Sequence, residues 1–319
     1  MRILAIRLAR FGDIVLLLPA LTLIKTRLPD SHLTFLTDDR WGPIAAMCPA
    51  IDEVMTIDRI HMRDGSLWHS ASRIWRLLGD LRRQRFDAVI DCHGFRETNL
   101  LTWWTRAPQR LGLRRFDQSF LPFCFNLPSV LEDKNLHVSE MFLRLACTFA
   151  PSSVEAPTQP SLVIPKEELA WAKENLPAPT YALMFVDAPV PERRWPLDRF
   201  AALADHFVAK LGASVVIVGI SEHISGKFPP GVPVLTDLTI PRLAATIASA
   251  RMLVSNDTGP MHLGPALGIP TVAIFSVGLP VHFRPTGVLD RCVRGNPIEE
   301  VDVEEVMRVA SELWAASDH

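Results

Sequence analysis

The sequence predicts an α/β protein with two doubly wound, Rossmann-like domains. The chain has 319 residues, which exceeds the size at which a single hydrophobic core keeps growing. In both halves, short apolar runs with strand character alternate with longer amphipathic segments, and such alternation implies parallel sheets. Between the halves, residues 151–160 hold three prolines together with Ser, Thr and Gln, a composition typical of a linker.

The first half opens with an apolar run at residues 3–8, which ends in a Gly-containing turn and leads into a second apolar run at 14–28. A strand, a tight turn and a helix in that order form the first unit of a doubly wound domain. Apolar runs bounded by turn residues predict the other strands, and apolar residues recurring every three to four positions predict the helices. Further strands are expected at 32–36, 53–57, 88–91 and 110–112, and further helices at 41–47, 70–84 and 98–104.

The second half repeats the alternation. Its strands are expected at 181–186, 214–218, 252–255 and 271–275, and its helices at 197–211, 243–250, 261–267 and 303–315. The pattern predicts one domain at residues 1–155, a second at 156–300, and a last helix within 301–319.

The composition describes an ordinary globular protein, with 48% hydrophobic and 21% charged residues. A net charge of −2 supplies no overall attraction to nucleic acid, so no such partner is expected and any anion site must be local. The chain has five cysteines and no C-x-x-C pair. That usage favours a reducing, cytoplasmic compartment and disfavours a structural zinc site.

The apolar run at residues 14–24 is too short to cross a membrane. It spans 11 residues, is interrupted by Pro19 and is preceded by Asp13, whereas a bilayer span needs about 20 apolar residues. A secretory signal would not tolerate that acidic flank. We therefore expect a buried helix, and any membrane contact to be peripheral.

The most informative stretch is residues 255–262, Ser-Asn-Asp-Thr-Gly-Pro-Met-His. It lies where an expected strand hands over to an expected helix, which Thr258 can cap and whose first turn accommodates Pro260. Free N–H groups at such a turn, at Thr258 and Gly259, form an anion site that the helix dipole strengthens. With Asp257 and His262 beside it, the turn suits a nucleotide diphosphate. The alternatives are that Asp257 only helps to cap the helix and that His262 is a packed core residue.

Two motifs resemble those of the ADP-heptose:lipopolysaccharide heptosyltransferases, glycosyltransferase family 9. The family opens with Arg-Leu-x-x-x-Gly-Asp-x-x-x-x-x-Pro, which Arg7-Leu8, Gly12-Asp13 and Pro19 match. Near its end it carries Asn-Asp-[Ser/Thr]-Gly-x-x-His, which residues 256–262 match. The two motifs stand in the family's order, and the resemblance covers nearly the whole chain.

The resemblance implies a GT-B fold, in which two Rossmann-like domains face each other across a cleft. The first domain would bind the acceptor, the second the donor, and the final helix would cross back to the first domain. The implied reaction is inverting transfer of a sugar from a nucleotide-sugar donor resembling ADP-heptose to a lipid-linked or core oligosaccharide of lipopolysaccharide. The resemblance also implies an enzyme that needs no cofactor or metal. It implies activity in the cytoplasm and is compatible with peripheral contact at the cytoplasmic face of the inner membrane.

Asp13 is the expected general base, because a carboxylate at a strand-end turn can take the proton of an acceptor hydroxyl. The family gives its Asp the same role, and the alternative is a helix N-cap. Arg193, in Glu-Arg-Arg-Trp-Pro, replaces the lysine of a family Lys-x-Trp-Pro motif and would neutralise the departing diphosphate. The alternative there is a solvated surface pair. Glu222 matches a family Gly-x-x-Glu that meets the donor's ribose; read alone, it is a solvated loop residue.

Three positions depart from the family pattern. Asp187 stands where small residues are usual and would repel a diphosphate unless it points away. Pro265 interrupts the helix after His262, since proline removes a backbone hydrogen bond. Ser276 begins a loop where the family continues Gly-Pro-Thr-x-Pro.

For the acceptor, basic and imidazole side chains near expected strand ends suit a phosphorylated or carboxylated sugar. These candidates are Arg10, His93, Arg96, Arg110 and His137, with Arg114 and Arg115 beside them. Trp103-Trp104 and the aromatic residues of 116–125 add apolar surface that suits either a buried core or a membrane contact.

Two other functions remain open. One is a same-fold nucleotide-sugar epimerase or hydrolase, and the other is a non-catalytic sugar-nucleotide binding protein. The chain has no Walker A and no G-x-G-x-x-G sequence, which disfavours kinases and dehydrogenases.

Overall fold

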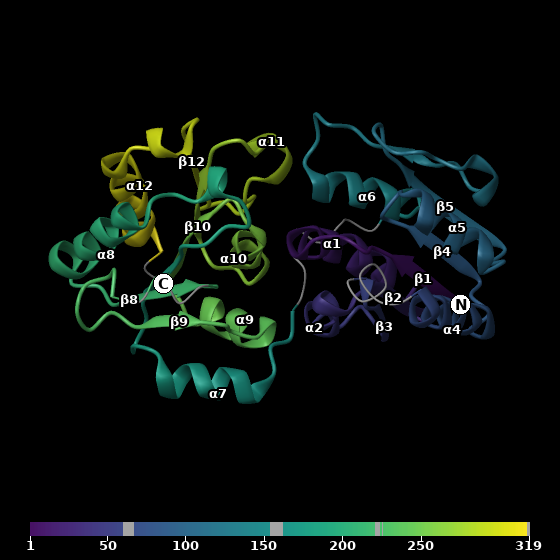
Figure 1. The fold of residues 1–319 in the computed structure, drawn as a ribbon, viewed down its shortest axis with the longest axis horizontal. Helices are drawn as coiled ribbons and strands as arrows, with labels where there is room; N and C mark the ends of the chain where they lie inside the picture. Colours follow the sequence, from purple (N-terminus) through teal and green to yellow (C-terminus); the bar gives the residue numbers. More distant parts are fainter. Residues whose placement is uncertain (60–66, 154–161, 221–223, 225, 318–319) are drawn as a thin grey trace. The chain divides into compact units, whose positions relative to one another are not determined.

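A computed structural model describes residues 1–59, 67–153, 162–220, 224 and 226–317 (Figure 1). Its contacts divide the chain into two compact units, Met1–Ser161 and Leu162–His319. Each unit contains a six-stranded parallel sheet, which confirms the α/β prediction. The domain boundary expected after residue 155 lies outside the described residues.

The first unit has the strand order β3-β2-β1-β4-β5-β6. Its strands are β1 (Arg2–Ile6), β2 (His32–Asp38), β3 (Glu53–Ile57), β4 (Ala88–Asp91), β5 (Gln109–Arg114) and β6 (Val130–Leu131). Its helices are α1 (Phe11–Arg27), α2 (Gly42–Ala46), α4 (Leu67–Arg83), α5 (Arg96–Trp104) and α6 (Val138–Phe149), with 3-10 turns η1 (Asp39–Trp41) and η2 (Pro122–Cys124). The order reverses between β1 and β4, and ligands of such sheets bind beyond the carboxyl ends of the strands at that switch point.

The second unit repeats this topology with the order β12-β11-β10-β7-β8-β9. Its strands are β7 (Ala182–Phe185), β8 (Val215–Gly219), β9 (Val234–Thr236), β10 (Met252–Asn256), β11 (Thr271–Phe275) and β12 (Arg291–Arg294). Its helices are α7 (Lys166–Asn175), α8 (Leu197–Leu211), α9 (Ile240–Ala248), α10 (Leu263–Ala266), α11 (Pro280–Phe283) and α12 (Val303–Ala316), with turns η3 (Pro191–Arg193), η5 (Gly259–His262) and η6 (Ile298–Glu300). Here the switch point lies between β7 and β10.

Three strands were not expected from the sequence. β6 has two residues and β9 three, too few to show any periodicity. β12 has the sequence Arg-Cys-Val-Arg and buries only its valine. All three lie at a sheet edge, where a strand needs little apolar surface.

The helix expected at 261–267 is broken in two. The chain forms the 3-10 turn η5 and then the four-residue helix α10. Pro260 and Pro265 cannot donate backbone hydrogen bonds, and Gly268 takes a φ of +75° that ends the helix. The expected capping of this helix by Thr258 is absent, since its side chain makes no cap hydrogen bond.

The last helix, α12, packs on the second unit. Val306, Ala310 and Leu313 are buried in the same core as Trp195 and Phe207. Within this unit, α12 contacts α8 and the strands β10, β11 and β12.

The apolar run at 14–24 is a buried helix, as predicted. Helix α1 buries eleven of its residues, including Pro19, and packs against α6. Among the described residues, no helix combines the length and the apolar character that crossing a bilayer requires.

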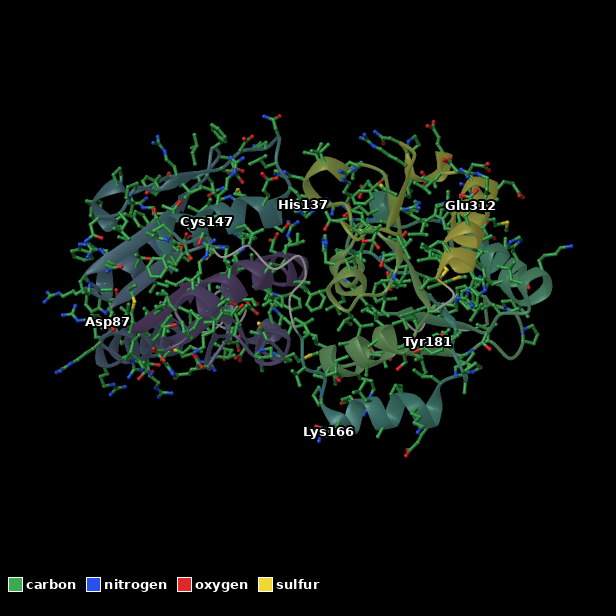
Figure 2. The ribbon with its side chains drawn as sticks, turned by 180° about the vertical axis from the view of Figure 1, so that it is seen from behind. Asp87, His137, Cys147, Lys166, Tyr181 and Glu312 are labelled. Carbon is green, nitrogen blue, oxygen red and sulfur yellow. The ribbon has the colours of Figure 1, made fainter. Side chains whose placement is uncertain are left out.

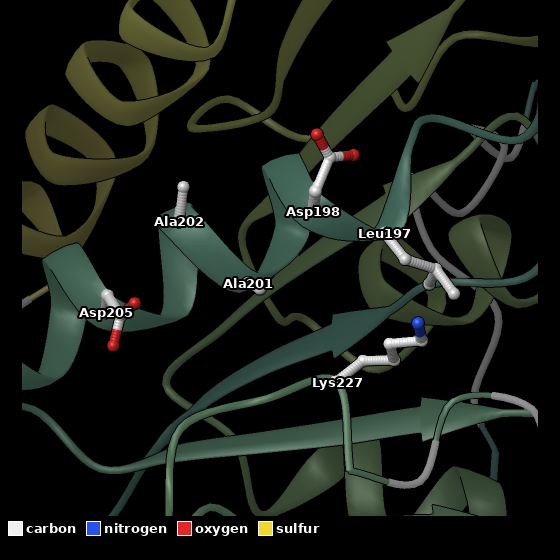
Figure 3. Close-up of a pocket in the computed structure, with 6 residues that line it drawn as sticks. All are labelled: Leu197, Asp198, Ala201, Ala202, Asp205 and Lys227. Carbon is white, nitrogen blue, oxygen red and sulfur yellow. The ribbon is translucent and has the colours of Figure 1, made fainter.

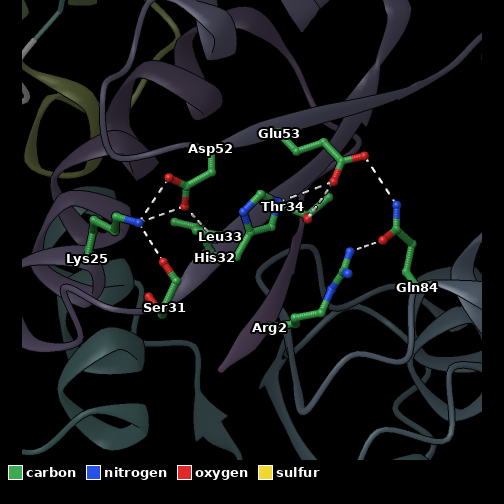
Figure 4. Close-up of polar contacts among 9 residues, drawn as sticks. All are labelled: Arg2, Lys25, Ser31, His32, Leu33, Thr34, Asp52, Glu53 and Gln84. Atoms are coloured by element: carbon green, nitrogen blue, oxygen red, sulfur yellow. Dashed lines mark hydrogen bonds and ion pairs between the residues drawn. The ribbon is translucent and has the colours of Figure 1, made fainter.

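A polar network ties α1 to the amino-terminal edge of the first sheet (Figure 4). The Lys25 ammonium donates to both carboxylate oxygens of Asp52 at 3.0 and 2.7 Å, and the Leu33 N–H donates to the same carboxylate at 2.7 Å. Burial opposes the ionisation of Asp52, but these donors outweigh it, so the pKa of its carboxyl lies below the usual value. This network lies at the amino ends of the strands, whereas the switch point lies at their carboxyl ends, and it stabilises the fold.

Candidate functional site

Polar side chains gather at the switch point of each sheet. We call Arg7, Asp13 and His93, with the arginines around them, the β1–β4 cluster. The β7–β10 cluster consists of Asp187, Arg193, Arg194, Asn256 and Asp257.

Asp13 lies in the first turn of α1, where it pairs with Arg7. The Arg7 Nη2 is 3.1 Å from Asp13 Oδ2, and the Asp13 side chain is 19% exposed. Arg7 directly follows β1, is buried, and donates from Nη1 to the carbonyl of Cys92 at 2.7 Å. Asp13 is not the N-cap, a position that Arg10 occupies. The carboxylate therefore keeps a solvent-accessible side next to a fixed cation.

His93 is the buried centre of the first cluster. It lies two residues after β4, and its ring centroid is 4.2 Å from that of Phe95. Burial, together with the charges of Arg7, Arg59 and Arg115, lowers the pKa of the imidazole to about 2. His93 is therefore neutral at physiological pH.

Asp91 fixes the loop that carries His93. Its Oδ1 accepts the N–H groups of His93 and Gly94, each at 2.9 Å, and its Oδ2 accepts the Asn99 amide at 2.8 Å. Gly94 has a φ of +73°, and a Cβ there would collide with the carbonyl of Leu113. The turn after β4 thus requires glycine.

The arginines around His93 form a site suited to an anion. Arg59 donates from Nη1 to the carbonyl of Leu8 at 2.5 Å, and Arg115 pairs with the buried Glu132 at 3.3 Å. The sequence pointed to Arg115 but missed Arg59. That residue belongs to no motif, and its only signal was its place two residues after β3.

The other acceptor candidates lie outside this cluster. Arg10 and Arg96 are exposed at the starts of α1 and α5. His137, labelled in Figure 2, caps α6 by accepting the Ser139 N–H at 3.3 Å. Arg110 lies beside Val89, toward the amino-terminal end of β5. It donates to the carbonyls of Cys124 and Ala107 at 2.8 and 2.6 Å, so its guanidinium has a structural role there.

Asn256 holds the second cluster together. Its Oδ1 accepts the Trp195 N–H at 3.1 Å, and its Nδ2 donates to the carbonyl of Val186 at 2.9 Å. Trp195 is fully buried and donates from Nε1 to Val301 at 3.0 Å. These bonds join the ends of β7 and β10 to Trp195, which directly follows Arg193 and Arg194 in the chain.

Arg193 pairs with Asp257 across a distance of 3.2 Å between Nη1 and Oδ2. The Asp257 side chain is 5% exposed, so this is not a solvated surface pair. Burial raises the pKa of the Asp257 carboxyl, and the charge of Arg193 opposes that shift. Gly278 packs directly on this carboxylate, and a Cβ there would collide with it.

Asp187 is neutralised by Arg194. The Arg194 Nε lies 3.1 Å from Asp187 Oδ1, and the backbone N–H groups of Ala188 and Ile220 donate to the two carboxylate oxygens at 3.1 Å. Ser276, the other departure in this region, donates its hydroxyl hydrogen bond to the carbonyl of Glu192 and so fixes η3. Both departures are built into the cluster.

The remaining donor candidates lie at the turn after β10 or outside the described residues. Gly259 begins η5 and Thr258 directly precedes it, while His262 is buried at the end of η5, with its ring centroid 6.5 Å from that of Phe283. Glu222 lies outside the described residues. Within the described ranges, no group of three or more His, Cys, Asp or Glu side chains could hold a metal ion.

A hollow of about 510 Å³ lies along α8 and contains no residue of either cluster (Figure 3). Its lining is Leu197, Asp198, Ala201, Ala202, Asp205 and Lys227. Two carboxylates and one ammonium give it no preference for an anionic ligand.

Comparisons with known proteins agree with this geometry. The chain is 25% identical over 293 residues to lipopolysaccharide heptosyltransferase 1 of Pseudomonas aeruginosa, covering 86% of this chain and 78% of the relative. The glycosyltransferase family 9 structure from Veillonella parvula superposes with a TM-score of 0.84 at 23% identity, covering 99% of this chain and 97% of that one. The E. coli heptosyltransferase WaaC with ADP gives a TM-score of 0.81 at 21% identity, covering 98% and 100%. These neighbours confirm the GT-B fold class, and the model of glycosyltransferase family 9 (heptosyltransferase) matches residues 74–310. The chain belongs to glycosyltransferase family 9, the heptosyltransferase family.

Proposed function

We propose that this glycosyltransferase is an inverting enzyme that moves heptose from ADP-heptose to a lipopolysaccharide core or related glycan. The observation that carries the proposal is the partly exposed Asp13 carboxylate, paired with Arg7 at the switch point of the first sheet. The proposed acceptor is supported by a relative that is named a lipopolysaccharide heptosyltransferase. The proposed donor is supported by a structural neighbour that is a heptosyltransferase with ADP.

The reaction is one displacement. Asp13 takes the proton of the acceptor hydroxyl, and that oxygen attacks the anomeric carbon of the donor sugar. The bond between the anomeric carbon and the diphosphate breaks, and ADP leaves with the electron pair. Arg193 neutralises the charge that builds on the departing diphosphate.

The other candidate residues would position the two substrates. Thr258, Gly259 and His262 would line the phosphate end of the donor site, and Glu222 would accept hydrogen bonds from the ribose. On the acceptor side, Arg59 and Arg115 would bind an acidic group beside the neutral His93, with Arg10 and Arg96 at the exposed helix starts.

Release of ADP distinguishes this function from its alternatives. We expect ADP to appear only when ADP-heptose and a lipopolysaccharide core acceptor are both present. An epimerase or hydrolase would convert the donor alone, and a non-catalytic binding protein would bind it without turnover.

A thermal-shift comparison of ADP-, GDP-, UDP- and dTDP-sugars identifies the donor, because a ligand of the native state raises the apparent stability of the protein.

We expect the same assay to proceed in excess EDTA. A leaving diphosphate is neutralised either by Mg²⁺ or by fixed cations, and Arg193 is placed to act as the fixed cation. Asp257 would be the metal's ligand if one were needed. Turnover that EDTA abolishes and that Mg²⁺ or Mn²⁺ restores would give Asp257 that role and remove this part of the proposal.

We place peripheral contact with the cytoplasmic face of the inner membrane on α5. Arg96, Leu100 and Trp103 are exposed and follow one another at helical spacing, and the exposed Phe123 lies edge-on to Trp103 at 6.3 Å. Aromatic rings with arginines nearby suit an anionic membrane surface. Co-sedimentation with anionic vesicles should weaken in Trp103→Ala, and unchanged binding would remove α5 from this contact.

A further inference from the structure

The two carboxylates of the β7–β10 cluster occupy equivalent places on neighbouring strands. Phe185 of β7 pairs with Ser255 of β10, and each strand carries an aspartate two residues further on, Asp187 and Asp257. Two consecutive arginines form ion pairs with these aspartates, Arg193 with Asp257 and Arg194 with Asp187. Two cations and two carboxylates therefore cancel where the diphosphate is proposed to bind.

The two pairs are held to different degrees. Arg193 meets Asp257 through one ion pair. Among the described residues, its buried Nε has no hydrogen-bond partner, and neither has Asp257 Oδ2. Arg193 therefore gives up one ion pair when it turns to a ligand, and its Nε has no hydrogen bond to lose.

Arg194 is held from two sides. Its Nε pairs with Asp187, and its Nη2 donates to the carbonyl of Ala188 at 2.8 Å. Asp187 is itself anchored by the N–H groups of Ala188 and Ile220 and is 7% exposed. Turning Arg194 to a ligand would break two contacts, with Asp187 and with the carbonyl of Ala188, whereas Arg193 gives up only one.

We propose that Asp187 withholds Arg194 from the nucleotide diphosphate, so that Arg193 alone of the two arginines binds it. This inference rests on the proposed function, since it takes the β7–β10 cluster as the diphosphate site. A second arginine on the diphosphate would tighten the donor and the product ADP alike, and such uniform binding lowers KM without raising kcat. Asp187 is thus a positioning residue that limits affinity and lets ADP leave.

Asp187→Asn tests the proposal, because it removes the charge and keeps one side-chain oxygen, which can accept one of the two N–H groups that Ala188 and Ile220 donate. We expect the Kd of ADP, measured by calorimetry, to fall at least about tenfold, the value of a new charged hydrogen bond. The affinity for adenosine should not change, and KM for the donor should fall with no gain in kcat. The double variant Asp187→Asn/Arg194→Gln should lose the gain.

Asp290→Asn is the matched control for charge removal in the same unit. Asp290 accepts the Thr271 N–H at 2.9 Å at the start of β11, whereas the β7–β10 cluster lies at the carboxyl ends of the strands. Removing the charge of Asp290 should therefore leave the Kd of ADP unchanged. Melting temperatures of all variants report their folding.

Two results would overturn the inference. One is an Asp187→Asn variant that binds ADP no more tightly than the wild type. The other is a double variant as tight as Asp187→Asn, which would make the gain an effect of charge alone. If the wild type binds ADP and Arg193→Ala weakens it, either result leaves the proposed function standing. If the wild type binds no ADP, the proposed function fails, and the inference fails with it.

Discussion

Asp13→Asn is expected to cut turnover by about 10²- to 10⁴-fold, the usual contribution of a general base. The amide cannot take the proton of the acceptor hydroxyl. It has nearly the shape of the carboxylate, so helix α1 and the position of Arg7 should persist. The Kd of ADP should stay unchanged, because Asp13 belongs to the first unit and the proposed diphosphate site to the second. Steady-state release of ADP and calorimetry measure the two quantities.

Asp30→Asn is the control for this variant. Asp30 is an exposed acidic residue between α1 and β2, near the amino ends of the strands and away from the β1–β4 cluster. Its substitution should leave turnover unchanged. If Asp13→Asn keeps activity within a few fold of the wild type, Asp13 is not the base. His93 could not replace it as a base near neutral pH, since its pKa of about 2 makes the imidazole too weak.

Arg193→Ala is expected to raise the Kd of ADP by about 10- to 150-fold, the equivalent of a charged hydrogen bond of about 1.5–3 kcal/mol. Adenosine carries no phosphate, so its affinity should change little. Turnover should fall as well, because the fixed cation also stabilises the departing diphosphate. Calorimetric titration with ADP and with adenosine separates these effects.

The control here is Arg308→Ala, which removes an exposed arginine of α12 that pairs with Glu312. It should leave both affinities unchanged. An equal loss for ADP and adenosine in Arg193→Ala would indicate a folding defect, because the variant also leaves the buried Asp257 without its counter-ion. Arg193→Lys should recover part of the ADP affinity, since it restores the charge without the planar fork.

The sequence by itself determined the fold class and the places of both clusters. The alternation of apolar runs with amphipathic helices produced the parallel sheets, and the turns after residues 3–8 and 252–255 lie at the switch points. It could not predict β12, whose Arg-Cys-Val-Arg buries one side chain. It also predicted one helix from 261 to 267, where two prolines give a 3-10 turn and a short helix.

Only the tertiary structure decided which charges meet. Arg110 and His93 were both acceptor-site candidates in the sequence, yet the Arg110 guanidinium donates to the carbonyls of Cys124 and Ala107. Arg59 belongs to no motif, yet its charge acts on the His93 imidazole. Asp187 read as a charge that would repel a diphosphate, and the structure pairs it with Arg194. Strand-end motifs depend on neighbours in the chain and can be read from it. Ion pairs depend on which loops the sheet order brings side by side, and that order is set by the packing of the whole unit.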